Sequence, residues 1–397
     1  MVNSDLTLFI EINNSKFSFS VGKKDDHGIF KFDSLDIQIS GIEDNRIDDL
    51  EKVYNTLKEN IYSLEKKNNF TFREIILILD NFDPLFLNIS GFKKLNGSQV
   101  LKENITYILN SLKSFVNEVE PKKTILHIFN SQFLLDNKKV YNLPIGLFGD
   151  FYCHELSFAL INTSDLKNLK NIFSKCDLKI SKIFLKSFVI GANISENNKD
   201  IENFFHIKID DHYTKILYFE NNSLKFEQKF KFGNDIIIKD ISKITSLKRN
   251  TVIKILENIQ FDENLLKDEL IEEIYFKKDV YKKVKKKLVY EIIIARAKEI
   301  SEILIFKNIN VRYHNKVTKN IFLEIINLSQ FKSLKEIYEN VFSDNKKIQI
   351  NFLKPDSAET ILKTTSKLVH FGWKTEAIPI SNVKKSMITR FFETIFG

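Results

Sequence analysis

The chain has 397 residues, 43% of them hydrophobic, which is enough for two or more folded domains with apolar cores. Only 11 of its 397 residues are glycine, which is less than half of the average usage of about 7%. The sequence has no G-x-G-x-x-G or P-loop pattern, which argues against Rossmann and P-loop enzymes. The 60 basic and 52 acidic residues leave a net charge of +8 that is spread along the chain, which permits acidic partners without indicating nucleic acid.

The first part of the chain alternates predicted strands and helices. Period-two patterns and short apolar runs predict three strands, at Leu6–Ile12, Phe17–Val21 and Ile29–Ile39. Apolar residues at helical spacing then predict an amphipathic helix over Ile47–Leu64. The apolar run Ile75–Leu79 is typical of a strand that is buried on both faces. We therefore expect a sheet covered by a helix.

A segment with a different pattern follows between residues 85 and 162. Strand-like pieces surround one predicted helix, Gln99–Val116; the strands are Phe86–Ile89, Thr124–Phe129 and Tyr152–Leu160. This pattern predicts a small inserted α+β subdomain. After it, helical spacing returns at Leu166–Ile172, and Ile180–Ile190 is another strand-like run.

The second half repeats the opening pattern. Three more strands are predicted, at Phe204–Ile209, Thr214–Phe219 and Ser223–Lys231. A helix is predicted from Asp235, as a helix follows the third strand of the first half. The stretch Ser246–Phe306 is predicted to be largely helical and to end in a long amphipathic segment, Tyr281–Ile305, before shorter pieces that continue to Ile380. Two similar halves indicate an internal duplication.

The C-terminal end has an amphipathic pattern. On a helical wheel, the apolar residues of Met387–Gly397 occupy one half and the polar residues the other. The pattern predicts a helix lying in the plane of an anionic membrane surface, bound through Lys384, Lys385, Met387, Ile388, Phe391, Phe392, Ile395 and Phe396. The polar stretch Ser381–Lys385 favours this anchor over a helix docked on the protein's own core. One such helix binds weakly, so stable attachment requires several copies acting together.

Several segments carry motifs of one protein family. Phe9–Lys16 is similar to hydrophobic-[D/E]-I-G-T-[S/A]-K, a first phosphate loop: Glu11, Ser15 and Lys16 are kept, and Asn13 and Asn14 replace its Gly and Thr. Ile125–Ile128 and Leu143–Gly149 are similar to L-H-V-I-P-Q and P-[I/V]-G-[L/M]-x-G, and Ile292–Ile300 is similar to I-I-x-x-R-x-x-E-I. The amphipathic end, Ser386–Gly397, resembles a membrane-targeting sequence. These are motifs of FtsA, the actin-like family that tethers the bacterial division ring to the membrane, and the resemblance spans nearly the whole chain.

The resemblance implies a fold and a domain order. FtsA belongs to the actin/Hsp70 superfamily, so we expect an α/β protein of actin-like fold, with duplicated RNase H-like domains and an α+β FtsA-type insertion subdomain. The implied parts are subdomain 1A (1–84 and 163–198), the inserted subdomain 1C (85–162), subdomain 2A (199–245 and 306–380), subdomain 2B (246–305), and a hinge with the membrane-targeting helix (381–397).

The sequence departs from the family at its nucleotide-binding motifs. The second phosphate loop, D-I-G-G-G-T-T-D-I, aligns with Lys208–Ile216, which has no glycine and has Lys208 and Lys215 in place of two aspartates. The adenosine motif L-T-G-G-G aligns with Val311–Asn315, again without glycine. Phosphate hairpins point consecutive backbone N–H groups at the phosphates, and large side chains block that approach. A lost aspartate also removes a ligand for Mg²⁺.

These losses favour a cleft without an ordinary Mg–ATP site over weak ATP or ADP binding without turnover, and they favour both over retained hydrolysis. The resemblance places the degenerate cleft at Glu11, Ser15, Lys16, Lys208, Asp210, Thr214, Gly233, Asp235 and Lys254. Two roles are open for Lys208 and Lys215: they neutralise phosphate, or they fill the vacant cleft by pairing with Glu11 or Asp210.

No catalytic or metal-binding pattern is found in the sequence. Cys153 and Cys176 lack C-x-x-C spacing, and the seven histidines form no recognisable nucleophile–base arrangement. His154 and Glu155 do not open an H-E-x-x-H site, because Phe158 stands where the second histidine is needed. We therefore expect no catalytic residue, no metal and no resident cofactor.

The densest positive run comprises Lys277, Lys278, Lys282, Lys283, Lys285, Lys286 and Lys287, and Arg296 follows further along the chain. Such a run is most often a solvated helix face. The resemblance offers a function, because FtsA receives the acidic C-terminal peptide of FtsZ in this subdomain; it implies contacts through Lys286, Lys287 and Arg296. Nucleic-acid binding is a weaker third alternative, since aromatic stacking residues are missing.

The resemblance implies a cell division scaffold at the division site, on the cytoplasmic side of the bacterial cell membrane. Its expected partners are FtsZ, other division proteins, the anionic membrane surface and further copies of itself in a filament. Without a signal peptide or an apolar run of about 18 residues, we expect peripheral membrane contact. Two alternatives are an adaptor like PilM of pilus assembly, against which Pro144–Gly149 and the tail argue, and a sugar-kinase-like or Hsp70-like ATPase, against which the missing glycines argue.

Overall fold

The computed structural model describes residues 6–377, apart from residues 14–15, 25–29, 39–41, 44–45, 81, 263, 265–267, 277–278, 312–317, 327–330, 332 and 344–347. The chain forms two compact units: unit 1 is Met1–Phe184 with Leu368–Gly397, and unit 2 is Leu185–Lys367. The finer subdomain boundaries stay predictions. Within the described part of the chain, no helix combines the length and the apolar character that crossing a bilayer requires.

Unit 1 is built on a five-stranded sheet with the order β11-β6-β1-β2-β3. Its strands are β1 (Leu6–Ile12), β2 (Lys16–Lys24), β3 (Phe30–Gln38), β6 (Glu74–Leu79) and β11 (Lys179–Leu185), and a small ribbon follows β3, made of β4 (Ile42–Glu43) and β5 (Arg46–Ile47). β1 pairs antiparallel with β2 and parallel with β6. Every residue of β6 after Glu74 is buried, which confirms the strand predicted from the apolar run.

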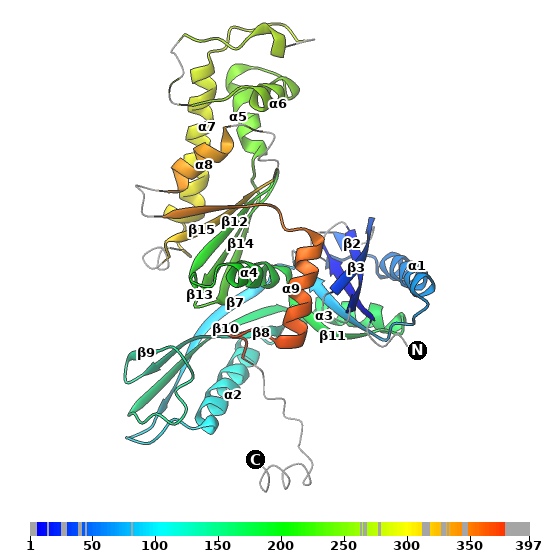
Figure 1. Ribbon diagram of the computed structural model, residues 1–397, viewed down its shortest axis with the longest axis vertical. Helices are drawn as coiled ribbons and strands as arrows, with labels where there is room; N and C mark the ends of the chain where they lie inside the picture. The colour runs from blue at the N-terminus through cyan, green and yellow to red at the C-terminus, as the bar shows by residue number, and fades with distance from the viewer. Residues whose placement is uncertain are drawn as a thin grey trace. The chain divides into compact units, whose positions relative to one another are not determined.

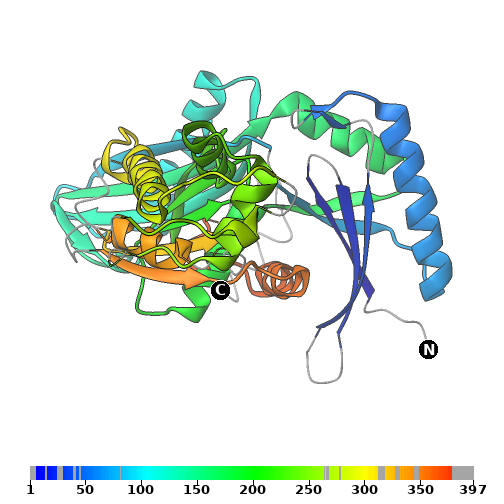
Figure 2. The same cartoon turned by 90° about the horizontal axis from the view of Figure 1, so that it is seen from above.

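Helices α1 (Leu50–Asn68) and α3 (Thr163–Lys175) lie beside each other on one side of this sheet (Figure 2). The carboxylate of Asp49 caps α1 by accepting hydrogen bonds from the backbone N–H groups of Glu51 and Lys52, at 3.1 and 3.0 Å. The bond from Lys52 is the main cause that lowers the pKa of Asp49. Asn69, in the left-handed conformation at φ 46°, ends the helix.

A four-stranded sheet with the order β7-β10-β8-β9 occupies the segment for which an insertion is predicted. Its strands are β7 (Leu85–Lys94), β8 (Lys123–Leu135), β9 (Lys138–Val140) and β10 (Phe151–Asn162), and α2 (Lys102–Val119) packs on it. Gly91 allows this packing, because a Cβ there would lie 2.5 Å from Cγ2 of Ile108 on α2.

Unit 2 contains a second five-stranded sheet, with the order β14-β13-β12-β15-β16. Its strands are β12 (Phe204–Ile209), β13 (Thr214–Glu220), β14 (Ser223–Phe230), β15 (Asn320–Ile325) and β16 (Gln349–Leu353). In both units the third, second and first strands form an antiparallel meander, and the first strand pairs in parallel with the fourth. This duplication is the actin-like α/β fold that the sequence predicts.

The helices of unit 2 cover both faces of its sheet (Figure 1). On one face lie α5 (Asp235–Thr245), α6 (Arg249–Asn258), α7 (Lys286–Ser301) and α8 (Leu334–Phe342), and they share a core with Phe205, Ile207 and Ile209 of β12. On the other face lies α4 (Lys186–Asn197). Shorter or later elements are the 3₁₀ turn η1 (Glu273–Tyr275), the π-helical turn η2 (Glu302–Phe306) and α9 (Ala358–Phe371).

The prediction of a strand over Ile180–Ile190 is wrong in its second part. β11 ends at Leu185, and the next residues belong to helix α4. A continuous apolar run does not distinguish a buried strand from a buried helix. Gly191 is the reason why α4 is buried so closely, since a Cβ there would lie 1.8 Å from Cζ of Phe219 on β13.

The prediction of helix over most of Ser246–Phe306 is also wrong in part. The described residues between α6 and η1 contain no helix, and α7 begins at Lys286 rather than at Tyr281. Lys285, directly before α7, has extended backbone and bridges Leu270, and the carbonyl of Val284 accepts a hydrogen bond from the N–H of Ile271 at 2.9 Å. This backbone pairing outweighs the helical spacing of the side chains.

Candidate functional site

Two equivalent hairpins carry the phosphate-loop positions predicted from the sequence. In unit 1 the hairpin joins β1 to β2, and in unit 2 it joins β12 to β13. The last paired residues are Ile12 with Phe17 in the first and Ile209 with Thr214 in the second, so the two hairpins have the same length. The two predicted phosphate loops therefore occupy equivalent positions in their sheets.

The fourth strand of each sheet meets its hairpin in the same way. The N–H of Asp80, just after β6, donates to the carbonyl of Ile12 at 2.9 Å. The N–H of Ile326, just after β15, donates to the carbonyl of Ile209, also at 2.9 Å. The two sheets therefore hold the start of their hairpins in the same way.

In unit 1, the side chain of Lys16 is held by a neighbouring strand. Its Nζ lies 2.6 Å from Oδ2 of Asp36 on β3, and its backbone N–H donates to Oδ1 of Asn13 at 2.9 Å. Glu11 is half-buried on β1. Ser15 lies outside the described residues. Lys16 is thus neutralised within unit 1.

In unit 2, Lys208 forms an ion pair with a buried carboxylate. Lys208 on β12 and Glu324 on β15 are direct neighbours in the parallel ladder, and Nζ of Lys208 lies 2.9 Å from Oε1 of Glu324. Within unit 2, Lys208 therefore pairs with Glu324 instead of the predicted Asp210, because the adjacent strand presents this carboxylate. The alternative pairing with Glu11 stays a prediction. Lys215 likewise pairs with Glu227 of β14, at 3.1 Å.

Glu324 belongs to a buried polar cluster. Its side chain is only 2% exposed, and Nε2 of His206 lies 3.4 Å from its Oε2. Burial by itself would raise the pKa of Glu324, but the interaction with His206 and the charge of Lys208 lower it to about 2. Burial, followed by the charge of Glu324, raises the pKa of nearby Asp356, which accepts a hydrogen bond from Nδ2 of Asn193 at 3.2 Å.

The turn after β14 is held against the hairpin of unit 2 by backbone hydrogen bonds. The N–H of Asn234 donates to the carbonyl of Asp210 at 2.9 Å, and the N–H of Asp235 donates to that of Asp211 at 3.0 Å. A helix N-terminus commonly binds anions through such free N–H groups. Here these two donors, at the start of α5, are used by the hairpin itself. Thr214 is fully buried, and its hydroxyl donates to the carbonyl of Phe232 at 2.8 Å.

Gly233 makes this closure possible, and we expect Gly233→Ala to disturb it. A Cβ at this position would lie 2.0 Å from the carbonyl oxygen of Asp210, so the hairpin and the start of α5 must separate. We predict a loss of about 2–3 kcal/mol in the free energy of unfolding, measured by chemical denaturation. Gly146→Ala is the comparison, because at φ +85° it strains the backbone but no atom lies within 4 Å of its Cβ; a loss at Gly233→Ala larger than at Gly146→Ala therefore measures the clash with Asp210. Equal stability of Gly233→Ala and the natural chain would contradict the packing described.

Asp235 is surrounded by cations of its own unit. Its side chain is 6% exposed and forms ion pairs with Arg249 and with Lys239, the latter at 3.1 Å. Burial would raise the pKa of Asp235, but the hydrogen bonds from Lys239 and Arg249 lower it overall. Lys254 lies on α6, where its charge acts on Asp279. The predicted cleft residues Lys208, Asp210, Thr214, Gly233 and Asp235 thus lie at or next to the hairpin of unit 2. Lys254 lies apart from them on α6.

The remaining predicted nucleotide motif is only partly described. Val311 is fully buried and belongs to the core that β12 shares with α5–α8. The other residues of this motif, 312–315, lie outside the described residues, as does the whole predicted membrane tail from 381 to 397. In the described residues, no group of three or more His, Cys, Asp or Glu side chains is arranged to hold a metal ion.

The residues predicted to bind the FtsZ peptide have different environments. Nε of Arg296 on α7 lies 2.5 Å from Asp240 of α5, and Nη1 lies 2.5 Å from Glu299; the bond with Asp240 is the main cause that raises the pKa of Arg296. Lys286 is largely buried and lies 2.6 Å from Glu269. Lys287 is half-buried and forms no ion pair with the described residues. Arg296 and Lys286 therefore contribute to the packing of unit 2.

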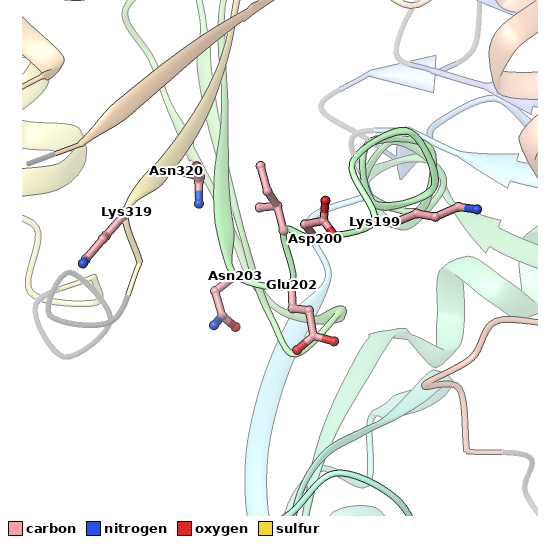
Figure 3. Close-up of a pocket in the computed structure, with 7 residues that line it drawn as sticks. Lys199, Asp200, Glu202, Asn203, Lys319 and Asn320 are labelled. Carbon is pink, nitrogen blue, oxygen red and sulfur yellow. The ribbon is translucent and has the colours of Figure 1, made fainter.

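A polar pocket of about 390 Å³ lies at the opposite end of the unit 2 sheet from the hairpin (Figure 3). It is found beside the amino ends of β12 and β15, and its lining includes Lys199, Asp200, Glu202, Asn203 and Lys319. Ligands of open α/β sheets bind at the carboxyl ends of strands, so this pocket is not the predicted nucleotide site. Sequence reasoning missed it, since it is assembled from loops without a motif.

The two sheets of the same strand order, each with an equivalent hairpin, define an actin-like fold. Beside the hairpin of unit 2, Lys208 and Lys215 form ion pairs with carboxylates of the neighbouring strands. No protein-family model matches the chain. It is 22% identical over 387 residues to the cell division protein FtsA of Buchnera aphidicola subsp. Acyrthosiphon pisum, covering 90% of this chain and 87% of that protein.

Two further relatives are matched over shorter stretches. The chain is 23% identical over 241 residues to FtsA of Buchnera aphidicola subsp. Schizaphis graminum, which covers 60% of this chain and 57% of that protein. The match to FtsA of Buchnera aphidicola subsp. Baizongia pistaciae is 21% over 253 residues and covers 62% of this chain and 58% of that protein. These matches agree with the motifs: the chain is similar in sequence to FtsA cell division proteins.

Solved structures give weaker similarities. The PilM–PilN type IV pilus biogenesis complex matches with a TM-score of 0.49 at 9% identity, over 88% of both chains. MreB5 of Spiroplasma citri bound to AMPPNP matches with a TM-score of 0.44 at 10% identity, over 91% of this chain and 96% of that chain. We base the fold class on the strand order of the two sheets.

Proposed function

We propose that the chain is a non-catalytic scaffold of bacterial cell division that links FtsZ filaments to the cytoplasmic face of the cell membrane. The relation to FtsA supports the role in division. The observation that supports a scaffold rather than an ATPase is the ion pair between Lys208 and Glu324. Lys208 stands where the family's second phosphate loop has an aspartate, the ligand that would hold Mg²⁺ and its water.

The charge at this position argues against a Mg–ATP site. A lysine ammonium repels a divalent cation, and the carboxylate that neutralises it is buried on the adjacent strand rather than exposed at the hairpin. The turn Gly233–Asp235 also uses the backbone donors at the start of α5 for the hairpin carbonyls. Weak ATP or ADP binding without turnover is compatible with this arrangement. Hydrolysis would need the Mg²⁺-binding aspartate that Lys208 replaces.

Nucleotide titration tests this proposal. The full chain is titrated with Mg–ATP and Mg–ADP by calorimetry, and phosphate release is followed over hours, with an ATP-hydrolysing actin-like protein as the positive control. We expect no saturable binding in the micromolar range and no phosphate release above the blank. Micromolar affinity together with phosphate release would refute the non-catalytic scaffold.

We further propose that the FtsZ C-terminal peptide binds at the amino end of α7. Among the described lysines of this run, Lys282, Lys283 and Lys287 form no ion pair with the described residues. Lys282 donates to the carbonyl of Ser246 at 2.5 Å, so Lys283 and Lys287 are the ones offered to an acidic peptide. Lys286 and Arg296, which the resemblance also implies, act by holding α7 against its neighbours. Lys277 and Lys278, from the same run, lie outside the described residues.

The membrane contact is assigned to the C-terminal tail. Met387, Ile388, Phe391, Phe392, Ile395 and Phe396 form the apolar face that would enter the lipid, and Lys384 and Lys385 would contact anionic headgroups. Because one such helix binds weakly, the proposal includes self-association of the chain, so that several tails act together on one membrane.

A further inference from the structure

The last described residues of the chain dock on the open edge of β8, in the insertion sheet of unit 1, through an isolated β-bridge. Glu376 pairs antiparallel with Phe129 of β8. The N–H of Asn130 donates to the carbonyl of Thr375 at 2.6 Å. β9 pairs with β8 only at Phe133–Leu135, so the segment fills an edge of β8 that no described strand covers.

A second backbone bond and a buried side chain continue this pairing. The N–H of Ala377 donates to the carbonyl of Ile128 at 2.8 Å. Ala377 itself is 7% exposed and belongs to the core of the insertion, together with residues of α2 and β10. The segment is therefore packed as well as hydrogen-bonded, across a large separation in sequence.

A buried histidine holds the segment from the side. Nδ1 of His127 lies 3.0 Å from Oε1 of Glu376, and the histidine side chain is 2% exposed. The imidazole is fixed in place between two rings, because its centroid lies 5.8 Å from that of Phe129 and 5.9 Å from that of Phe184, both nearly parallel to it. Glu376 thus meets a rigid partner that is well separated from water.

The segment stands between the end of α9 and the predicted tether. Gly372, at φ +70°, ends the helix in the left-handed conformation that glycine adopts without strain, and Phe371 before it is 87% exposed. After Ala377, residues 378–386 lead to the amphipathic sequence that begins at Met387. The pairing with β8 is the last described contact before that sequence.

We propose that Trp373–Ala377 is a detachable segment, docked on β8, that fixes the point from which the membrane tether leaves the protein, with His127 and Glu376 as its positioning residues; the tether itself rests on the function proposed above. While the segment is docked, the nine residues 378–386 can span at most about 30 Å, at roughly 3.3 Å per residue. When it detaches, the free chain begins at Gly372 and its reach grows to about 50 Å. Docking therefore sets the distance between the insertion and the membrane.

The chain contains a convenient reporter for this segment. Trp373 is its single tryptophan, and it opens the segment; the exposed Lys374 next to it is a trypsin site. Ala377→Pro removes the N–H that donates to Ile128, and Glu376→Lys places a cation against His127. Glu376→Gln keeps an oxygen acceptor at the same place and is the matched control. β8 remains paired with β10 in all three variants, so we expect them to stay folded.

The first measurement is made without membranes. In Ala377→Pro and Glu376→Lys we expect stronger acrylamide quenching of Trp373, roughly tenfold faster trypsin cleavage after Lys374, and loss of hydrogen-exchange protection at the N–H of Asn130. The natural chain and Glu376→Gln should be protected at all three places. If the natural chain is as accessible as Ala377→Pro, the segment is not docked in solution and the proposal is wrong.

The second measurement uses vesicles of anionic lipid that contain brominated phospholipid. Released Trp373 should reach the bilayer, so we expect bromine to quench Ala377→Pro more strongly than the natural chain, at equal amounts of bound protein. Equal quenching would refute the role of the segment in fixing the tether. If neither protein binds the vesicles, the proposed tether fails, whereas the docking of the segment is still decided by the first measurement.

Discussion

Lys208→Ala is expected to lower the free energy of unfolding at pH 7 by about 3 kcal/mol, because it leaves the buried carboxylate of Glu324 without its ammonium partner. Removing one member of a buried ion pair is costly, since the remaining charge has lost its compensation in a place that water does not reach. Lys208→Met combined with Glu324→Leu removes both charges and should be close to the natural chain. Urea unfolding followed by circular dichroism measures these differences.

The same pair predicts a dependence on pH. The pKa of Glu324 is about 2 in the folded chain, against an ordinary value of 4.5, so its ionised form stabilises the fold. This contribution is complete above about pH 4.5 and is lost as the pH falls toward 2. The stability difference between the natural chain and Lys208→Ala should therefore shrink over this range. Equal stability at pH 7, or a difference that is constant down to pH 2, would contradict the role given to this pair.

Phe391→Asp together with Phe392→Asp is expected to abolish binding to anionic liposomes. Each phenylalanine that enters lipid contributes about 2 kcal/mol, and each aspartate is repelled by the anionic surface. The combined loss corresponds to an affinity at least about 100-fold lower, measured by co-sedimentation. Thr389→Asp with Thr394→Asp adds the same charge on the predicted polar face and should keep most of the binding. Similar sedimentation of both double variants would contradict an amphipathic anchor.

The periodic parts of the fold are predictable from the sequence. β1 and β12 begin and end at the predicted residues, and the apolar run of β6 identifies a strand that is buried between neighbours. Such strands carry their signal in consecutive residues. Helix α4 has no such signal, because its burial depends on the close approach of Gly191 to Phe219, which only the folded chain brings together.

The candidate site is predictable in its position but not in its partners. The hairpin at Lys208–Thr214 and the turn at Gly233 follow from the motif alignment. Lys208 pairs with Glu324 because of the register between β12 and β15. The sequence does not reveal this register, since the two parallel strands are joined by a long connection. The docking of Trp373–Ala377 could not be predicted either, because it joins His127 to a residue 249 positions away.

Arg296 shows the limit of a family motif. Its position matches the motif, and the resemblance makes it a peptide-binding residue, but its guanidinium is engaged by Asp240 and Glu299. A motif residue that holds two helices together and one that contacts a partner look alike in a sequence. Arg296→Ala is therefore expected to lower stability and peptide binding together, whereas Lys287→Glu should lower peptide binding alone.

The claim that the chain is a division scaffold is tested most directly by the acidic C-terminal peptide of FtsZ. The full chain is titrated with the labelled peptide by fluorescence anisotropy at low and high salt, beside Lys287→Glu and beside Lys113→Glu, which makes the same change of net charge on α2 of unit 1. We predict saturable binding that weakens with salt and with Lys287→Glu, and that Lys113→Glu leaves unchanged. Absence of binding at every salt concentration would contradict the proposed function.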